Sequence, residues 1–200
     1  MSTGRSTTES RGFQPPWDAA LVLADGAIFR GIGFGAAVDA VGEAVFTTSM
    51  TGYQEVATDP SFRGQIVCMT YPLIGNYGVN AADDESRQPW IAGMVVREEC
   101  DHPSNWRSQG SFHDYLVSAS IPAISGIDTR AVTRHIREAG DIRAALVRNV
   151  AGRSDAELLD LAVNAPLPGE QDVVSEVIAD DVCPFWRWRR STRGCARLRC

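Results

Sequence analysis

Short apolar runs rich in β-branched residues alternate with turn residues along the chain, and this pattern predicts strands. Runs of four to eight such residues, bounded by Gly, Pro, Asn or Asp, are typical of strands that are buried on at least one face. Asp25-Gly26 separates the first two runs and predicts a tight two-residue hairpin. The predicted strands are 19–23, 27–30, 41–46, 65–71, 89–96, 121–124 and 142–147.

Between these strands, capping residues and the helical spacing of apolar positions predict four helices. The residues predicted to begin them are Thr51, Ser111, Asp128 and Ser154. The first and last of these are each followed three residues later by a capping-box partner, Gln54 and Glu157. The third helix has an apolar stripe at helical spacing and ends at Gly140.

A glycine-rich run, 31–35, resembles a dinucleotide-binding loop only superficially. A phosphate cradle needs a helix N-terminus directly after it, and residues 36–42 show no capped amphipathic run. We therefore interpret the run as a glycine-relaxed strand or a bulge.

The order of these elements predicts one α/β domain over residues 18–150, built of two sheets with helices on one side. Two hundred residues are enough for one such domain with a sizeable core. A Ser-, Thr- and Arg-rich leader, 1–17, is expected to be disordered, since it contains Pro15-Pro16 and little that could pack. Residues 151–181 begin with the fourth predicted helix, which Pro166-Leu167-Pro168-Gly169 breaks.

Composition narrows the class of protein. The net charge of −6 argues against nucleic-acid binding by the body of the chain, and no apolar run reaches the length of a membrane span. Five cysteines without an apolar export signal favour free thiols in a reducing cytoplasm. Cys68 is expected to be a small buried hydrophobe, and Cys100 with His102 lacks the second ligand pair that a metal site needs.

The last residues, 182–200, have a different composition. They hold six arginines, three cysteines and two tryptophans without an acid, so the rest of the chain has 13 basic and 25 acidic residues. A basic tail could contact nucleic acid or an anionic surface. The interpretation we favour is an aberrant Arg- and Cys-rich tail produced by a lost reading frame or a truncation. The segment has no periodicity that would predict a folded element.

Residues with special backbone or side-chain chemistry are most concentrated between positions 41 and 78. Three runs are TTSMTGYQE at 47–55, TDPSF at 58–62 and TYPLIGNYG at 70–78. Asp59-Pro60 favours a tight turn, which exposes Ser61 where two elements meet. Loops at the ends of ordered elements are where binding groups are usually found.

These runs resemble the N-terminal domain of the small, glutamine-hydrolysing subunit of carbamoyl-phosphate synthetase. Two further runs resemble it as well: SNWR at 104–107 and SGIDTRAVTR at 125–134. Departures are mild: Thr47 replaces an amide residue of the family pattern, and Phe62 replaces a tyrosine. The resemblance implies a layered β/β/α domain over residues 18–150. It also implies that residues 151–181 are a helix and linker toward a glutaminase domain that is absent here, since residues 172–177 resemble the family's linker.

The resemblance also implies a site residue. The family's glutamine pocket takes one serine from this domain, and that serine falls on Ser61. The family keeps its nucleophile in a C-terminal glutaminase domain, which has no counterpart in this sequence. We therefore assign no catalytic residue and no metal ligand, and we expect the chain to be inactive alone.

The resemblance further implies the reaction and the partners. The complete small subunit hydrolyses L-glutamine, and the large subunit, which holds ATP and Mg²⁺, combines the ammonia with bicarbonate to give carbamoyl phosphate for arginine and pyrimidine synthesis. No cofactor is expected in this chain, which docks on the large subunit in a cytoplasmic heterodimer. Arg130, Arg134 and Arg137 form either a solvated face or a partner contact. The alternative is a non-catalytic binding module that uses its basic tail.

Overall fold

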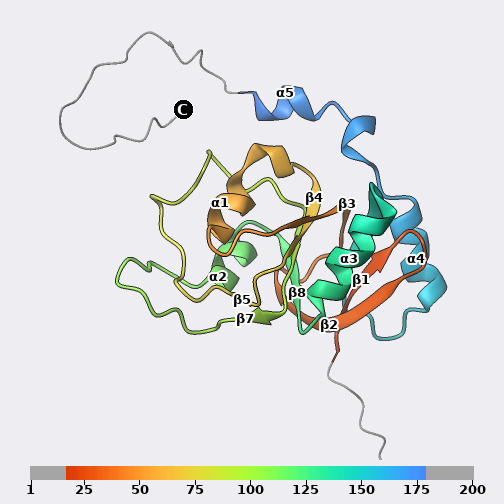
Figure 1. Cartoon of the computed structure of the whole chain (residues 1–200), viewed down its shortest axis with the longest axis horizontal. Coiled ribbons are helices and arrows are strands. Elements are labelled where there is room, and N and C mark those ends of the chain that lie inside the picture. Colours follow the sequence, from red (N-terminus) through yellow and green to blue (C-terminus); the bar gives the residue numbers. More distant parts are fainter. Residues whose placement is uncertain (1–16, 179–200) are drawn as a thin grey trace, which may run out of the picture.

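In residues 17–178, which the computed structural model describes, seven strands close into a barrel (Figure 1). Their order around the barrel is β1-β2-β8-β6-β4-β3-β9. The strands are β1 Ala19–Leu23, β2 Ile28–Gly35, β3 Ala40–Thr47, β4 Gln65–Met69, β6 Gly93–Val95, β8 Pro122–Ser125 and β9 Ile142–Arg148. Two short strands, β5 Leu73–Ile74 and β7 Glu98–Glu99, form a separate parallel pair.

The barrel combines two kinds of pairing. β3, β4, β6 and β8 run parallel to their neighbours in that series, with Ala44 opposite Ile66 and Met94 opposite Ala123. β1 pairs antiparallel with both β2 and β9. Two further antiparallel pairs, β2 with β8 and β3 with β9, complete the circle. Each parallel pair needs a crossover connection, and those connections hold helices and long loops.

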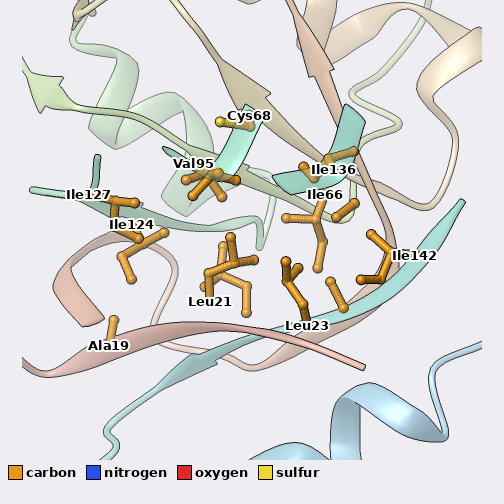
Figure 2. Close-up of a cluster of buried hydrophobic side chains, with 14 residues drawn as sticks. Ala19, Leu21, Leu23, Ile66, Cys68, Val95, Ile124, Ile127, Ile136 and Ile142 are labelled. Carbon is orange, nitrogen blue, oxygen red and sulfur yellow. The ribbon is translucent and has the colours of Figure 1, made fainter. Parts of the chain in front are cut away.

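Alternation along each strand separates an interior cluster from two outer ones. Leu21 and Leu23 of β1 and Ile66 of β4 point into the barrel, where Ile136 of a helix joins them (Figure 2). Each such aliphatic side chain contributes about 1.5–3 kcal/mol when it is fully buried. The interior cluster therefore holds together strands that are distant in sequence.

Five helices and two 3₁₀ turns cover the barrel. They are α1 Tyr53–Thr58, η1 Pro60–Phe62, α2 Phe112–Ser118, α3 Thr129–Ala139, α4 Asp155–Val163, η2 Pro168–Glu170 and α5 Val173–Val177, counted within residues 17–178. α3 packs on the interior cluster, α2 packs against β2 and β8, and α4 packs on the outer side of β1 and β9. α1 belongs to the same outer cluster as Val67 and Met69 of β4. None of the described helices has the length and apolar character needed to span a bilayer.

The seven predicted strands and three of the predicted helix starts are confirmed. Ser111, Asp128 and Ser154 each accept a hydrogen bond from the first turn of the helix that follows, and Glu157 completes the capping box of α4. The glycine run 31–35 lies in β2, as the strand interpretation required. α5 was not predicted; it is a short helix inside the expected linker.

The mixed α/β class is confirmed, whereas two sheets with helices on one side are not what the structure has. Both edges of the sheet are paired, so it closes into a barrel, and the helices pack on separate sides of it. The layered β/β/α arrangement is therefore not confirmed. The sequence could not indicate closure, because strand pairing at long range leaves no local pattern.

Two local predictions were wrong in detail. The first hairpin has a three-residue loop, in which Leu23 N–H donates to Ala27 O at 2.9 Å and Gly26 has φ 97°. The predicted strand 89–96 is regular only over β6, because Trp90 N–H donates to Ala57 O of α1 at 2.8 Å instead of to a strand. The proposed leader, apart from Trp17, and the tail 182–200 lie outside the described residues.

Cys68 is buried in the interior cluster, as predicted, and burial raises the pKa of its thiol to about 12 from 9.0. Only the thiolate reacts with iodoacetamide, so this shift lowers the reactive fraction at pH 8 about 1000-fold. We expect native protein to be alkylated at the partly exposed Cys100 and not at Cys68, measured by peptide mass spectrometry. Both should react in guanidinium chloride; native labelling of both at equal rates would contradict this packing.

Candidate functional site

Ser61 lies on an exposed corner formed by η1. Asp59 caps this turn, since its Oδ1 accepts a hydrogen bond from Ser61 N–H at 2.8 Å, and Pro60 occupies the first position. Arg63 N–H closes the turn on Pro60 O at 3.1 Å. The Ser61 side chain is exposed, and its hydroxyl makes no hydrogen bond to any residue of 17–178. A fixed backbone thus presents a hydroxyl that is free to bind a ligand.

The corner that carries Ser61 is in close contact with the barrel. Gly64 N–H donates to Trp90 O at 3.0 Å, and the Gln65 amide donates to Glu43 Oε2 at 2.7 Å at the start of β4. On the β3 side, a Cβ placed on Gly42 would lie 2.1 Å from Gly64 O. Only glycine at position 42 allows this approach, so the backbone that follows Ser61 is held in place by β3.

Residues 165–178 return to this corner after α4. The Arg63 guanidinium donates through Nε to Glu176 Oε2 at 2.8 Å, and Arg87 Nη2 donates to Glu176 O at 2.8 Å. A depression of about 160 Å³ lies between this segment and the barrel. Its walls are Val41, Arg63, Gly64, Trp90, Ile91, Ala92, Pro166, Pro168 and Gln171. The Arg63–Glu176 ion pair is half exposed and adds little stability. It shows that the chain passes beside Ser61.

A second feature, which we call the polar hollow, lies at the other end of α1 and encloses about 200 Å³. It is lined by Thr51, Gly52, Glu55, Tyr77, Asn80, Asp83, Asn105 and Arg107. Three of the sequence runs, 47–55, 70–78 and 104–107, contribute to it. The run 58–62 with Ser61 does not, because the six residues of α1 separate the two features.

The start of α1 corrects one prediction. Thr51 does not cap the helix; Gly52 precedes it with φ 86° and no side-chain hydrogen bond. Gln54 is buried and donates instead to Asn80 O at 2.8 Å and to Asp84 Oδ1 at 2.6 Å. Tertiary contacts of Gln54 with the loop at 80–84 thus replace the local capping box.

Tyrosine rings and one ion pair shape the polar hollow. Tyr77 stacks on Tyr53 with ring centroids 4.2 Å apart, and its hydroxyl accepts a hydrogen bond from Gly52 N–H at 2.6 Å. Burial raises the pKa of Tyr77, so the phenol is neutral at pH 7. Arg107 Nη2 donates to Asp83 Oδ1 at 2.7 Å. Sequence reasoning missed this hollow, because nothing local indicates that the three runs meet.

Two other candidates from the sequence lie apart from both features. The Cys100 thiol donates to His102 O at 3.4 Å, and no group of three metal-binding side chains occurs within residues 17–178. Arg130, Arg134 and Arg137 are exposed along α3. Arg134 lies 4.0 Å from Glu138 one helical turn further on.

The barrel domain, with its exposed serine corner, matches a known family. Residues 21–146 match the model described as "Carbamoyl-phosphate synthase small chain, CPSase domain". The chain therefore belongs to this family.

Curated relatives agree. This chain is 60% identical over 124 residues to the "Carbamoyl phosphate synthase small chain" of Symbiobacterium thermophilum. The match covers 62% of this chain and 34% of that protein. The chain is 52% identical over 162 residues to the protein of the same name from Thermosynechococcus vestitus, covering 81% and 42%. This chain thus spans about two fifths of the length of such relatives.

Among solved structures, one similarity is to "Aminopeptidase from Aneurinibacillus sp. strain AM-1". It covers 68% of this chain and 32% of that one, with 19% identity and a TM-score of 0.37. A similarity this weak carries no argument about fold or function.

The contact between Gly42 and Gly64 gives a test of how the corner is supported. Gly42→Ala should destabilise the protein by about 1–3 kcal/mol, because the added Cβ forces apart β3 and the backbone that follows η1. Gly169→Ala is the matched control, since nothing lies within 4 Å of a Cβ there. Chemical denaturation compares the two; equal unfolding free energies would mean that the close approach is not required.

Proposed function

We propose that this chain is a component of a glutamine-dependent carbamoyl-phosphate synthetase, in which it docks on the large subunit and lends Ser61 to the glutamine pocket. The observation that carries the proposal is the free, exposed hydroxyl of Ser61 on a capped turn. It lies within the domain that matches the small-chain family.

The chemistry of a serine hydroxyl fits substrate binding. It can donate to a carboxylate and accept from an ammonium group, the two charged ends of glutamine. A nucleophilic serine needs a base within hydrogen-bond reach, and Ser61 has none among residues 17–178. His113 contacts Glu99 and His135 contacts Asp25, so both imidazoles have partners elsewhere. Ser61 therefore positions substrate and does not attack it.

The course of residues 165–178 supports the placement of the pocket. Arg63, two residues after Ser61, holds Glu176, so the chain passes beside the corner. The relatives are longer than this chain, and we propose that their further length includes a glutaminase domain that begins next to Ser61. The corner would then form one wall of a cavity whose other walls, and whose nucleophile, come from that domain.

The remaining steps belong to the partner. In this proposal the large subunit binds ATP and Mg²⁺ and joins ammonia with bicarbonate, while this chain binds no cofactor. The product, carbamoyl phosphate, would feed arginine and pyrimidine synthesis in the cytoplasm. The alternative, a non-catalytic binding module, depends on the basic tail 182–200, which lies outside the described residues, and no described contact favours it.

The docking role has a direct test. We expect the purified chain to form a 1:1 complex with a carbamoyl-phosphate synthetase large subunit, measured by size-exclusion chromatography with light scattering. It should show no glutamine hydrolysis alone or in the complex, because Ser61 has no base within hydrogen-bond reach among residues 17–178. Glutamine turnover by the chain alone, or failure to form the complex, would overturn the proposal.

The role of Ser61 is tested in a chimera that joins residues 1–178 to the remaining part of the Symbiobacterium thermophilum small chain. With the large subunit added, Ser61→Ala should raise the KM for glutamine about 10-fold or more and leave kcat nearly unchanged, as expected for one lost hydrogen bond to a charged group. Ser61→Thr keeps the hydroxyl and should restore much of the binding.

Ser118→Ala is the matched control for this series, because Ser118 is exposed on α2 and its hydroxyl bonds only to Tyr115 O. An unchanged KM in Ser61→Ala would remove Ser61 from the glutamine pocket. A loss confined to kcat would assign it a different role.

A further inference from the structure

We propose that the face around the polar hollow is the surface that docks on the large subunit, and that the hollow receives an arginine or lysine side chain of that subunit. The proposal rests on the proposed function and adds to it a surface and the chemistry of its partner. Two exposed residues, Met50 and Trp106, are sequence neighbours of residues that line the hollow.

These two side chains are the most exposed large hydrophobics within residues 17–178. Trp106 is 92% exposed and Met50 is 71% exposed. Trp106 lies between Asn105 and Arg107, and Met50 precedes Thr51; all three of these neighbours line the hollow. Tryptophan is enriched among the residues that dominate binding energy, so an indole this exposed next to the hollow favours an interaction site.

The excess of acidic side chains in the hollow favours the binding of a cationic side chain. Its walls carry two carboxylates, Glu55 and Asp83, and one guanidinium, Arg107. Arg107 is engaged by Asp83 at 2.7 Å, so the charge of Glu55 is not compensated within the hollow. Glu55 Oε2 is shielded from solvent and has no hydrogen-bond partner in the described part of the chain. A carboxylate without a donor is costly, and a cationic side chain seated in the hollow would compensate the charge of the Glu55 carboxylate that lines it.

The hollow is formed before any partner arrives. Asn80 N–H donates to Gln54 Oε1 at 3.0 Å, and the Asn80 amide bonds to Asp83. On the other side, the stacked rings of Tyr53 and Tyr77 support Gly52. A preformed site loses little conformational entropy on binding, which suits a pocket that receives one anchoring side chain.

The docking face is separate from the Ser61 corner. The hollow and the depression under residues 166–171 share no lining residue, and α1 lies between them. One small domain can therefore contact the large subunit on one side and a glutaminase domain on the other.

The test measures the dissociation constant of the full chain for a purified large subunit by titration calorimetry. Trp106→Ala and Met50→Ala should weaken binding, with Trp106→Ala costing about 10-fold or more. Glu55→Gln should also weaken binding about 10-fold and should reduce its salt dependence, whereas Glu55→Lys should weaken it further.

Matched controls are Val163→Ala, a half-exposed hydrophobic on α4, and Glu138→Gln, an exposed carboxylate on α3. Both should bind within about twofold of the unaltered chain. Thermal unfolding of each variant separates lost binding from lost folding; the exposed Trp106 should be replaceable without a change in melting temperature.

The outcomes distinguish an error in the docking face from an error in the proposed function. If the unaltered chain binds and the variants of Met50, Glu55 and Trp106 bind equally well, the docking face is wrong while the proposed function stands. If the controls on α3 or α4 lose affinity instead, the interface lies there. If the unaltered chain does not bind a large subunit at all, both proposals fail.

Discussion

The parallel pairing of β3 with β4 is the constraint on which the functional features depend. Two adjacent parallel strands cannot be joined by a tight turn, so the chain must leave the end of β3 and return to the start of β4. Residues 48–64 make that crossover. The polar hollow forms where the crossover leaves β3, and the Ser61 corner forms where it enters β4. The register of one strand pair thus sets the positions of both.

The crossover is held by contacts from three other parts of the chain. Gln54 and Thr58 bond to the loop at 80–86, Tyr77 supports Gly52, and Trp90 N–H bonds to Ala57 O. The short α1 could not be stable in isolation, because helices of this length lack enough internal hydrogen bonds. Its stability comes from packing against the barrel. A short element fixed in this way can present groups to neighbours at both of its ends without bending.

Membership of the small-chain family gives these features their meaning. The chain spans about two fifths of its relatives, and we propose that other parts of the assembly complete its chemistry. Three groups would be unfavourable or without a role on an isolated domain. They are the free hydroxyl of Ser61, the uncompensated carboxylate of Glu55 and the exposed indole of Trp106. Each is explained if it faces a partner. This view also fits the proposal that Ser61 positions substrate, because no base lies within hydrogen-bond reach of its hydroxyl among residues 17–178.

Local signals were sufficient for much of the chain. The strands, the caps of α2, α3 and α4, and the turn at Asp59-Pro60 follow from residues within a few positions of one another, because backbone dihedral preferences and capping bonds are short-range. Thr51 shows where such reasoning ends: its side chain had the right spacing to Gln54, but the buried loop at 80–84 gave Gln54 better partners.

By itself, the sequence determined the seven strands, the starts of α2, α3 and α4, the family, and Ser61 as the candidate binding group. Only the tertiary structure decided that the sheet closes into a barrel, that three distant runs meet at one hollow, and that residues 165–178 pass beside Ser61. The reason is physical: hydrogen bonds within a turn are specified by neighbouring residues. Closure and convergence depend instead on side chains that are far apart in the chain and meet only when the core is packed.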